Sequence, residues 1–352
     1  MIKSLSLRNF TNFESIDIDF SPKVNVFIGE NSTGKTHLLK AAYTLCHGAS
    51  TFKKGEKDMA EDLEKELTKK LLQVFMPLDD HLGNMYRQGS NPWGALSAKL
   101  GKKGSIDCSF SEVSRYLEIE QDRYLGSTGE PSFIPTKEVL SFMKGFNSLY
   151  EKYDLSFDQT YYDLCLTLDL PEARREYLHE KVRWAMGEIR ALCGGSFVFY
   201  GGGKVTFKVE SGEHSANAMA EGFRKAGVLY RLMETGSVQP GQSGPLFWDE
   251  PEANLNPRLM RLLVQILLEL SREGQQIILA THDYVFIKWL DLLMDKEAGD
   301  QVRYHVLSRD DCEEVSVQMV DDYGAIPPNA IANAFSDMTK EQVRRKMGTL
   351  GK

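Results

Sequence analysis

Glycines, a lysine and a hydroxyl side chain occur near the N-terminus at the spacing G-x-x-x-x-G-K-[ST], in the run Gly29-Glu30-Asn31-Ser32-Thr33-Gly34-Lys35-Thr36. These residue types at this spacing bind phosphate, because backbone N–H groups of the loop surround the phosphate oxygens and the lysine reaches the β- and γ-phosphates. The threonine hydroxyl is an expected ligand of Mg²⁺. The run therefore predicts a site for a nucleoside triphosphate.

Two adjacent acids end an apolar run in the C-terminal half, Pro245-Leu246-Phe247-Trp248-Asp249-Glu250-Pro251. A buried strand that ends in this way brings both carboxylates to one edge of a sheet. At that edge we expect Asp249 to hold Mg²⁺ and Glu250 to polarise the attacking water as general base. In the alternative interpretation, Asp249 caps a helix whose first turn contains Glu250 and Pro251.

A histidine follows a second apolar run, Gln276-Ile277-Ile278-Leu279-Ala280-Thr281-His282-Asp283. A single histidine is usually structural, on the surface or hydrogen-bonded in a core. Here it comes third in the order of phosphate-binding loop, acidic pair and strand with histidine. We therefore expect His282 to reach the γ-phosphate.

The residue pattern also predicts the strands and the helix that position these side chains. The β-branched and aromatic run Val24-Asn25-Val26-Phe27-Ile28 is typical of a buried strand. From Leu38 to Cys46 apolar residues recur at helical spacing, so the loop lies between a strand and a helix, as its motif requires. A half-buried strand is indicated by the alternation of Phe13, Ile16, Ile18 and Phe20.

This order of motifs resembles an ATP-binding-cassette (ABC) ATPase head of the SMC, RecF and OLD group, as does the opening Ile2-Lys3-Ser4-Leu5-Ser6-Leu7-Arg8-Asn9-Phe10. The resemblance makes residues 29–36 the Walker A loop, with Asn31 near the γ-phosphate. Residues 247–251 are then Walker B, residues 252–257 the D-loop, and His282 the switch histidine. The implied fold is α/β: a P-loop NTPase of ABC-ATPase head type, with a mixed sheet, helices and an inserted, mostly helical lobe. The implied cofactors are ATP and Mg²⁺.

The family's signature motif, which contacts the γ-phosphate of the opposite subunit, is matched by Met219-Ala220-Glu221-Gly222-Phe223-Arg224-Lys225. Gly222 carries over, whereas Ala220 stands where the family usually has serine, and Ser215 is a possible replacement. An ordinary helix start is the alternative interpretation. Gln73 is the candidate for the Q-loop glutamine that senses Mg²⁺, with a surface helix position as its alternative.

The resemblance also implies a mechanism and a homodimer. Two ABC heads close around two nucleotides, and each site takes its Walker loops from one chain and its signature from the other. Catalysis is then mostly positioning and electrostatics. We expect slow ATP hydrolysis that is gated by dimerisation.

The chain divides into three predicted parts: residues 1–50 with Walker A, residues 51–195 as a mostly helical insertion, and residues 196–352 with the remaining motifs. Helices are predicted from Met59 to Leu72, from Val139 to Tyr153 and from Pro171 toward Leu192, and a loop over residues 126–135. A hairpin is predicted over 196–209. After His282 we expect a helix, two short strands and a basic C-terminal helix.

Composition favours a cytoplasmic protein without a membrane partner. No stretch approaches the roughly 20 apolar residues of a membrane span, and polar residues such as Arg8 and Asn9 interrupt any signal-peptide core. The cysteines are scattered without a C-x-x-C pair, which indicates neither a zinc site nor disulfides; they are Cys46, Cys108, Cys165, Cys193 and Cys312. The net charge of −8 argues against a surface that binds DNA throughout, although local basic groups leave DNA contact open.

Four functions fit parts of this pattern. Only 70 residues follow His282, too few for the Toprim nuclease of OLD proteins, so an effector nuclease or toxin is expected to be a separate chain. We favour a sensor or scaffold ATPase resembling the ATPase subunit of PARIS-type anti-phage systems. The alternative is a RecF-like repair ATPase that binds DNA. A transporter cassette is disfavoured by Ala220 and the Asn9-Phe10 opening, and a non-hydrolysing switch by the presence of Glu250 and His282.

Overall fold

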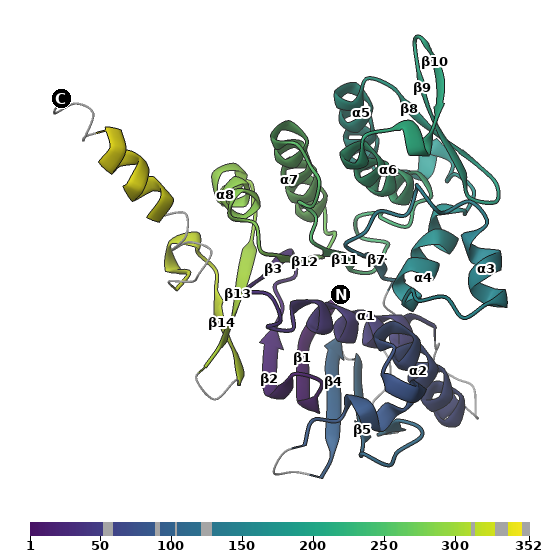
Figure 1. The fold of residues 1–352 in the computed structure, drawn as a ribbon, viewed down its shortest axis with the longest axis vertical. Coiled ribbons are helices and arrows are strands. Elements are labelled where there is room, and N and C mark those ends of the chain that lie inside the picture. The colour runs from purple at the N-terminus through teal and green to yellow at the C-terminus, as the bar shows by residue number, and fades with distance from the viewer. Residues whose placement is uncertain are drawn as a thin grey trace.

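The central sheet of the computed structural model has six strands in the order β14-β13-β3-β12-β11-β7 (Figure 1). All neighbours pair in parallel except β13 and β14. The structure describes residues 1–51, 59–88, 92–102, 104–120, 129–310, 314–327 and 337–346, with the side chains of 59–61 excluded. Cys312 and residues 126–128 of the predicted loop lie outside this part of the chain. The strands are β3 (Val24–Ile28), β7 (Ser132–Ile134), β11 (Leu246–Asp249), β12 (Ile277–Thr281), β13 (Val302–Arg309) and β14 (Val315–Val320).

Every residue of β3, β11 and β12 is buried, which explains why these strands read as continuous apolar runs rather than as alternating ones. Alternate side chains enter different cores. Trp248 and Leu279 belong to the core under α5 to α8, whereas Phe247 and Ile278 belong to the core around α1. Because the three strands are parallel, their carboxyl ends meet at one edge of the sheet, as the motif spacing predicts.

A second, antiparallel sheet has the order β2-β1-β4-β5-β6. The predicted N-terminal strands are confirmed as β1 (Ile2–Phe10) and β2 (Phe13–Asp19). The other three strands come from the insertion: β4 (Gly94–Leu100), β5 (Gly104–Phe110) and β6 (Glu118–Ile119).

The expectation of a mostly helical insertion is therefore wrong for residues 94–119, and also for β7, which is an edge strand of the central sheet. In β4 buried and less buried residues alternate, but the strand is built largely of alanine, serine and glycine, which are poor strand formers. It forms because β1 offers an open edge along its whole length. The limits of the insertion at 51 and 195 stay a prediction.

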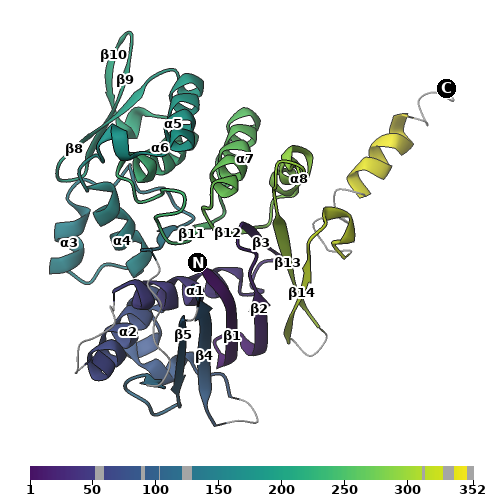
Figure 2. The same ribbon diagram turned by 180° about the vertical axis from the view of Figure 1, so that it is seen from behind.

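Helix α1 (Lys35–Thr51) lies between the two sheets (Figures 1 and 2). It contacts β11 and β12 on one side and β1 and β4 on the other. A helix enclosed in this way is apolar around most of its surface, as its sequence from Leu38 onward shows. The phosphate-binding loop is therefore connected directly to a helix that packs between the two sheets.

Helices α5 to α8 cover the opposite face of the central sheet (Figure 2). The helix predicted from Val139 begins only at Phe146, after Gly145 in the left-handed region, and the one predicted from Pro171 begins at Glu180, where the His179 side chain caps the Lys181 N–H. The remaining helices are α2 (Met59–Phe75), α3 (Phe146–Lys152), α4 (Gln159–Leu168), α5 (Glu180–Cys193), α6 (Glu221–Glu234), α7 (Pro257–Arg272) and α8 (Tyr284–Leu293).

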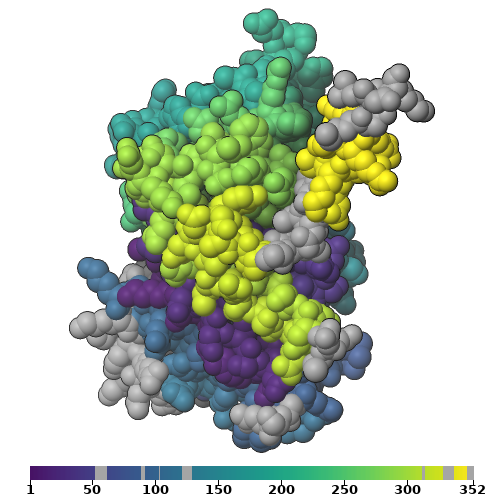
Figure 3. Space-filling model, turned by 90° about the vertical axis from the view of Figure 1, so that its left-hand side faces the viewer, coloured from purple at the N-terminus to yellow at the C-terminus, as the bar shows by residue number. Residues whose placement is uncertain are grey.

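The predicted hairpin is confirmed as β8 (Ser196–Tyr200) and β9 (Lys204–Val209), and β10 (Gly212–Ser215) extends it to three strands. The predicted basic tail is helical over residues 337–346. This helix stands away from the other elements in Figures 1 and 2, and Figure 3 shows the face on which it lies. No helix in the described ranges has the length and apolar character to cross a membrane. Of the five cysteines, Cys46, Cys108, Cys165 and Cys193 are buried and free.

Candidate functional site

The phosphate-binding loop needs glycine at both ends for a steric reason. At Gly29 a Cβ atom would lie 2.8 Å from the carbonyl oxygen of Leu307. At Gly34 the backbone has φ +89°, and a Cβ atom would lie 2.4 Å from the ring of Phe13. Strands β13 and β2 therefore restrict the loop to a close-fitting turn, which leaves Asn31 and Ser32 exposed and Thr33 buried.

Lys35 is 8% exposed, and its Nζ donates to the carbonyl oxygens of Gly29 (2.7 Å) and Glu30 (2.8 Å). Burial lowers its pKa, and the carboxylates of Asp249 and Glu250 partly oppose that shift. The ammonium group thus lies inside the turn of the loop and in the field of the acidic pair, as a group that binds phosphate should.

Thr36 and Asp249 meet across the edge of the sheet, where the Thr36 hydroxyl donates to Asp249 Oδ2 at 2.8 Å. The hydroxyl of Thr136, two residues after β7, donates to the same oxygen at 3.1 Å. Asp249 is 6% exposed, and burial raises its pKa although both hydroxyls oppose the shift. Hard oxygen donors of this kind suit Mg²⁺, so Thr36 and Asp249 fit the predicted ion.

Glu250 turns away from the strand that carries it. Its backbone has φ +51°, in the left-handed region, and its N–H donates to the carbonyl oxygen of Ala280 at 2.9 Å. This turn brings Glu250 Oε1 to 3.1 Å from Nδ1 of His282. The structure therefore joins the predicted general base and the predicted switch histidine, both still accessible to solvent.

The signature segment packs against the D-loop of its own chain. At Gly222 a Cβ atom would lie 2.9 Å from the carbonyl oxygen of Asn254, and Asn254 Nδ2 donates to Glu221 Oε1 at 2.6 Å. Ala220 is exposed at the N-cap of α6 and supplies no side-chain cap. Ser215 is exposed at the end of β10, before a separate short turn that begins at Ala216, so it does not replace a serine at the N-cap of α6.

Lys225, one turn into α6, connects this segment to Walker B. Its Nζ is enclosed and donates to the carbonyl oxygens of Glu250 (2.6 Å) and Ala253 (3.4 Å). The side chain is 2% exposed, and burial lowers its pKa to about 8. Lys225 thus holds the backbone of the residue expected to act as base.

The low pKa of Lys225 predicts a pH dependence of stability. Between about pH 8 and pH 10 the unfolded chain keeps a lysine proton that the folded chain has released, so the free energy of unfolding rises with pH. Relative to Lys225→Met, the parent should gain about 2 kcal/mol over this interval. Denaturant unfolding of both proteins at the two pH values measures the difference. If the free energy of unfolding changes equally with pH in both proteins, the pKa of Lys225 is not lowered by folding.

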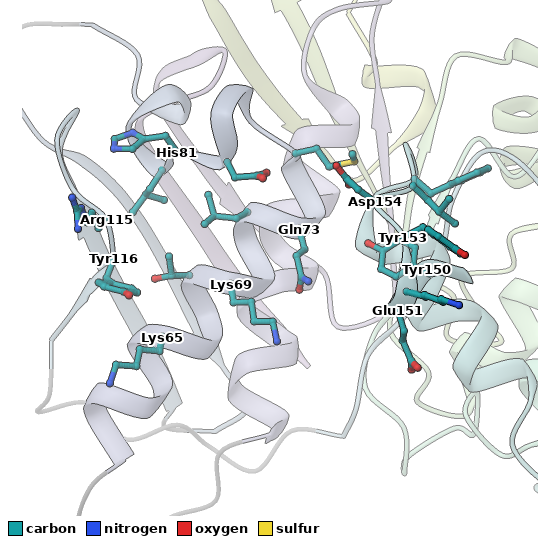
Figure 4. A pocket seen from close by; sticks show the side chains of 18 residues that line it. Lys65, Lys69, Gln73, His81, Arg115, Tyr116, Tyr150, Glu151, Tyr153 and Asp154 are labelled. Atoms are coloured by element: carbon teal, nitrogen blue, oxygen red, sulfur yellow. The ribbon is translucent and has the colours of Figure 1, made fainter. Parts of the chain in front are cut away.

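Gln73 lies on α2 and points into a surface pocket of about 790 Å³ between α2 and α3 (Figure 4). It also lines a smaller pocket beside α4. Neither pocket is lined by Thr36 or Asp249. The hydroxyl of Thr136 reaches the predicted magnesium ligand, and the role of Gln73 in sensing Mg²⁺ stays a prediction.

The sequence assigns no individual role to three residues of the site, Thr136, Lys225 and Glu252. Thr136 lies two residues after Ser132-Phe133-Ile134, a strand of only three residues that gives almost no periodic signal. Lys225 is one of several charged residues in the first turns of α6, and nothing in the sequence distinguishes it from the others. Glu252 was recognised as part of the D-loop, but the contacts of its side chain depend on β12.

Two family models match the chain. One, described as "AAA ATPase domain", covers residues 1–168 and contains the phosphate-binding loop. The other, described as "AAA domain, putative AbiEii toxin, Type IV TA system", covers residues 210–288, from the signature segment past His282. Both therefore cover parts of the chain that carry the site.

Curated relatives include the DNA replication and repair protein RecF of Streptococcus uberis, 32% identical over 152 residues, which are 43% of this chain and 36% of that protein. RecF of Streptococcus agalactiae is 27% identical over 179 residues, 51% of this chain and 40% of that protein. The matched region thus spans about two fifths of the length of these relatives.

Solved structures show the same fold. A crystal structure of the SmcHead bound to the C-winged helix domain of ScpA has a TM-score of 0.58 at 14% identity, covering 92% of this chain and 98% of that one. The Smc head domain with an extended coiled coil from Pyrococcus furiosus has a TM-score of 0.54 at 12% identity, covering 97% and 99%. The predicted fold class is confirmed: this is an α/β P-loop NTPase fold like that of SMC heads.

Proposed function

We propose that this chain is an ABC-type ATPase that binds and hydrolyses ATP and dimerises around the nucleotide. The observation that carries the proposal is the convergence of four side chains at one sheet edge. Thr36 contacts Asp249, and Glu250 contacts His282, although these residues come from helix α1 and from the carboxyl ends of two strands, β11 and β12. The AAA-type sequence matches and the SMC-head fold support the same chemistry.

Each residue has a distinct part in this proposal. The loop N–H groups from Gly29 to Thr36 and the Lys35 ammonium bind the phosphates. Thr36 and Asp249 would hold Mg²⁺, which neutralises charge on the phosphate oxygens. Glu250 accepts a proton from the attacking water, and His282 contacts the γ-phosphate. Most of the catalysis comes from positioning and electrostatics.

Dimerisation is supported by where the signature segment lies. The three atoms nearest to a Cβ at Gly222 belong to Asn254, Leu259 and Leu255, in the D-loop and α7 of its own chain, and none of them to its own phosphate-binding loop. In an ABC-type arrangement the nucleotide partner of Gly222 is therefore on a second chain. Hydrolysis should be slow at low protein concentration and rise steeply as chains pair.

Changing Gly222 to valine tests the paired site. The new side chain meets the Asn254 carbonyl at close range and occupies the surface that would face the second nucleotide. We expect ATP binding by the single chain to be retained within about twofold, while hydrolysis falls about a hundredfold. Fluorescent-ATP titration and phosphate release measure the two quantities. Equal loss of binding and turnover would place Gly222 in the chain's own nucleotide site.

We further propose that the ATPase acts as a sensor or scaffold for a separate effector, a nuclease or toxin, in anti-phage defence. The match of residues 210–288 to a domain model described with a toxin–antitoxin system supports this role. The net charge of −8 also favours a protein partner over DNA as the main one.

The second candidate is a DNA-repair ATPase, favoured by the sequence similarity to RecF proteins. It predicts hydrolysis that is stimulated by DNA and that loses this stimulation steeply with salt. The exposed basic helix at residues 337–346 offers cationic side chains for such contacts: Lys340, Arg344, Arg345 and Lys346.

One experiment separates these functions. ATP hydrolysis by the purified chain is measured alone, with duplex DNA, and with the product of the neighbouring gene. Stimulation by DNA alone supports the repair function, whereas DNA-independent turnover with stable co-purification of a neighbouring effector supports the scaffold function. A chain that hydrolyses no ATP under any condition contradicts the ATPase proposal itself.

A further inference from the structure

Glu252 is a third carboxylate at the site, behind Glu250 and His282. Its side chain is 6% exposed. Oε1 accepts a hydrogen bond from the Thr281 hydroxyl at 2.6 Å and a longer one from the His282 N–H at 3.4 Å. The carboxylate therefore contacts both residues at the end of β12, including the one that carries the imidazole.

The direction of these hydrogen bonds is fixed by the neighbouring backbone. The Thr281 oxygen accepts from the Asp283 N–H at 3.0 Å, so its own proton is available for Glu252. Asp283 in turn caps α8 through the Phe286 N–H at 2.6 Å. Glu252 is thus hydrogen-bonded into the turn that sets the position of His282 between β12 and α8.

The imidazole of His282 lies between two carboxylates. Nδ1 is 3.1 Å from Glu250 Oε1 and 3.9 Å from Glu252 Oε1. The other oxygen of Glu252, Oε2, is buried and accepts no hydrogen bond from the described part of the chain. A buried carboxylate oxygen without a hydrogen-bond donor lowers stability. Oε2 of Glu252 can still accept a donor, and we look for its use in the function of the site.

We infer that Glu252 is a positioning residue that holds His282 toward the nucleotide and accepts its Nδ1–H when Glu250 turns to the attacking water. This inference rests on the proposed ATPase function. When Glu250 takes a proton from the attacking water, its negative charge is neutralised and its hydrogen bond with Nδ1 of the imidazole weakens. Glu252 keeps Nδ1 hydrogen-bonded after that exchange, so Nε2 remains directed away from both carboxylates.

A double-mutant cycle of Glu252→Gln and His282→Ala tests the inference. Glutamine retains an oxygen for Thr281 and the His282 N–H, so the turn should fold and ATP should bind within about twofold of the parent. We expect kcat to fall about ten- to a hundredfold, the range for losing a partner that orients a functional side chain. In the His282→Ala background the same change should lower kcat by less than about twofold, because Glu252 acts through the imidazole.

The matched control is Glu269→Gln, which alters a carboxylate that pairs with Lys181 and Arg272 near the far end of α7. It should leave kcat and ATP affinity unchanged. Two results would overturn the inference while the ATPase function stands. One is a double mutant whose loss of kcat equals the product of the two single losses, and the other is a Glu252→Gln variant with the kcat of the parent. If the parent does not hydrolyse ATP, or if His282→Ala hydrolyses it like the parent, the proposed site itself is wrong and the inference falls with it.

Discussion

Replacing Glu250 with glutamine should lower ATP hydrolysis by at least about a hundredfold, the usual contribution of a general base. Glutamine has nearly the same shape and can still hydrogen-bond to His282, but it cannot take a proton from water. ATP should remain bound, because the phosphate-binding loop and Lys35 are unchanged. The closed dimer should therefore accumulate with ATP. Phosphate release and size-exclusion chromatography with ATP measure the two effects.

The control for this prediction is again Glu269→Gln, which replaces a carboxylate that pairs with Arg272 near the end of α7 and does not lie at the sheet edge. It should hydrolyse ATP like the parent and show no ATP-dependent dimer beyond the parental level. Parental hydrolysis by Glu250→Gln would show that another group acts as base. Loss of ATP binding would instead mean that Glu250 stabilises the loop.

Changing Asp249 to asparagine should have opposite effects on activity and on stability. Asparagine retains an oxygen for the hydroxyls of Thr36 and Thr136. It lacks the charge that would hold Mg²⁺, so magnesium-dependent hydrolysis should fall about a hundredfold or more. Burial already disfavours the charged carboxylate and raises its pKa, so the variant should unfold at the same temperature as the parent or higher.

Three measurements check this prediction: hydrolysis against magnesium concentration, ATP binding in EDTA, and thermal unfolding without nucleotide. Binding in EDTA should match the parent. A marked fall in melting temperature would show that Asp249 is needed mainly for the fold. Thr136→Val is the companion variant, since it removes one hydroxyl from Asp249 and leaves Thr36 in place.

The parts of the fold that the sequence predicts well are those whose signal is local. The loop from Gly29 to Thr36 is recognised from its own eight residues, and β3, β11 and β12 are apolar because both faces of the sheet are covered. The hairpin at 196–209 follows from residue types within the hairpin. Given a parallel sheet, the meeting of Asp249 with Thr36 then follows from strand direction.

The parts that the sequence does not predict depend on partners far along the chain. Strand β4 forms against β1, about 90 residues earlier, and its own residues are poor strand formers. Thr136 becomes part of the site only because β7 pairs with β11. Gln73 lines pockets beside α3 and α4 that neither Thr36 nor Asp249 lines. In each case the deciding contact is non-local.

The strand order of the central sheet also has a consequence for how the protein is made. The strand before the phosphate-binding loop, β3, pairs only with β12 and β13 in the described sheet. Both neighbours lie some 250 residues or more later in the chain. A ribosome needs roughly tens of seconds to translate that length. During that time the nascent chain carries an unpaired β3, so we expect the ATP site to assemble only after translation is nearly complete. Ribosome-bound chains stalled before residue 277 should therefore not bind ATP.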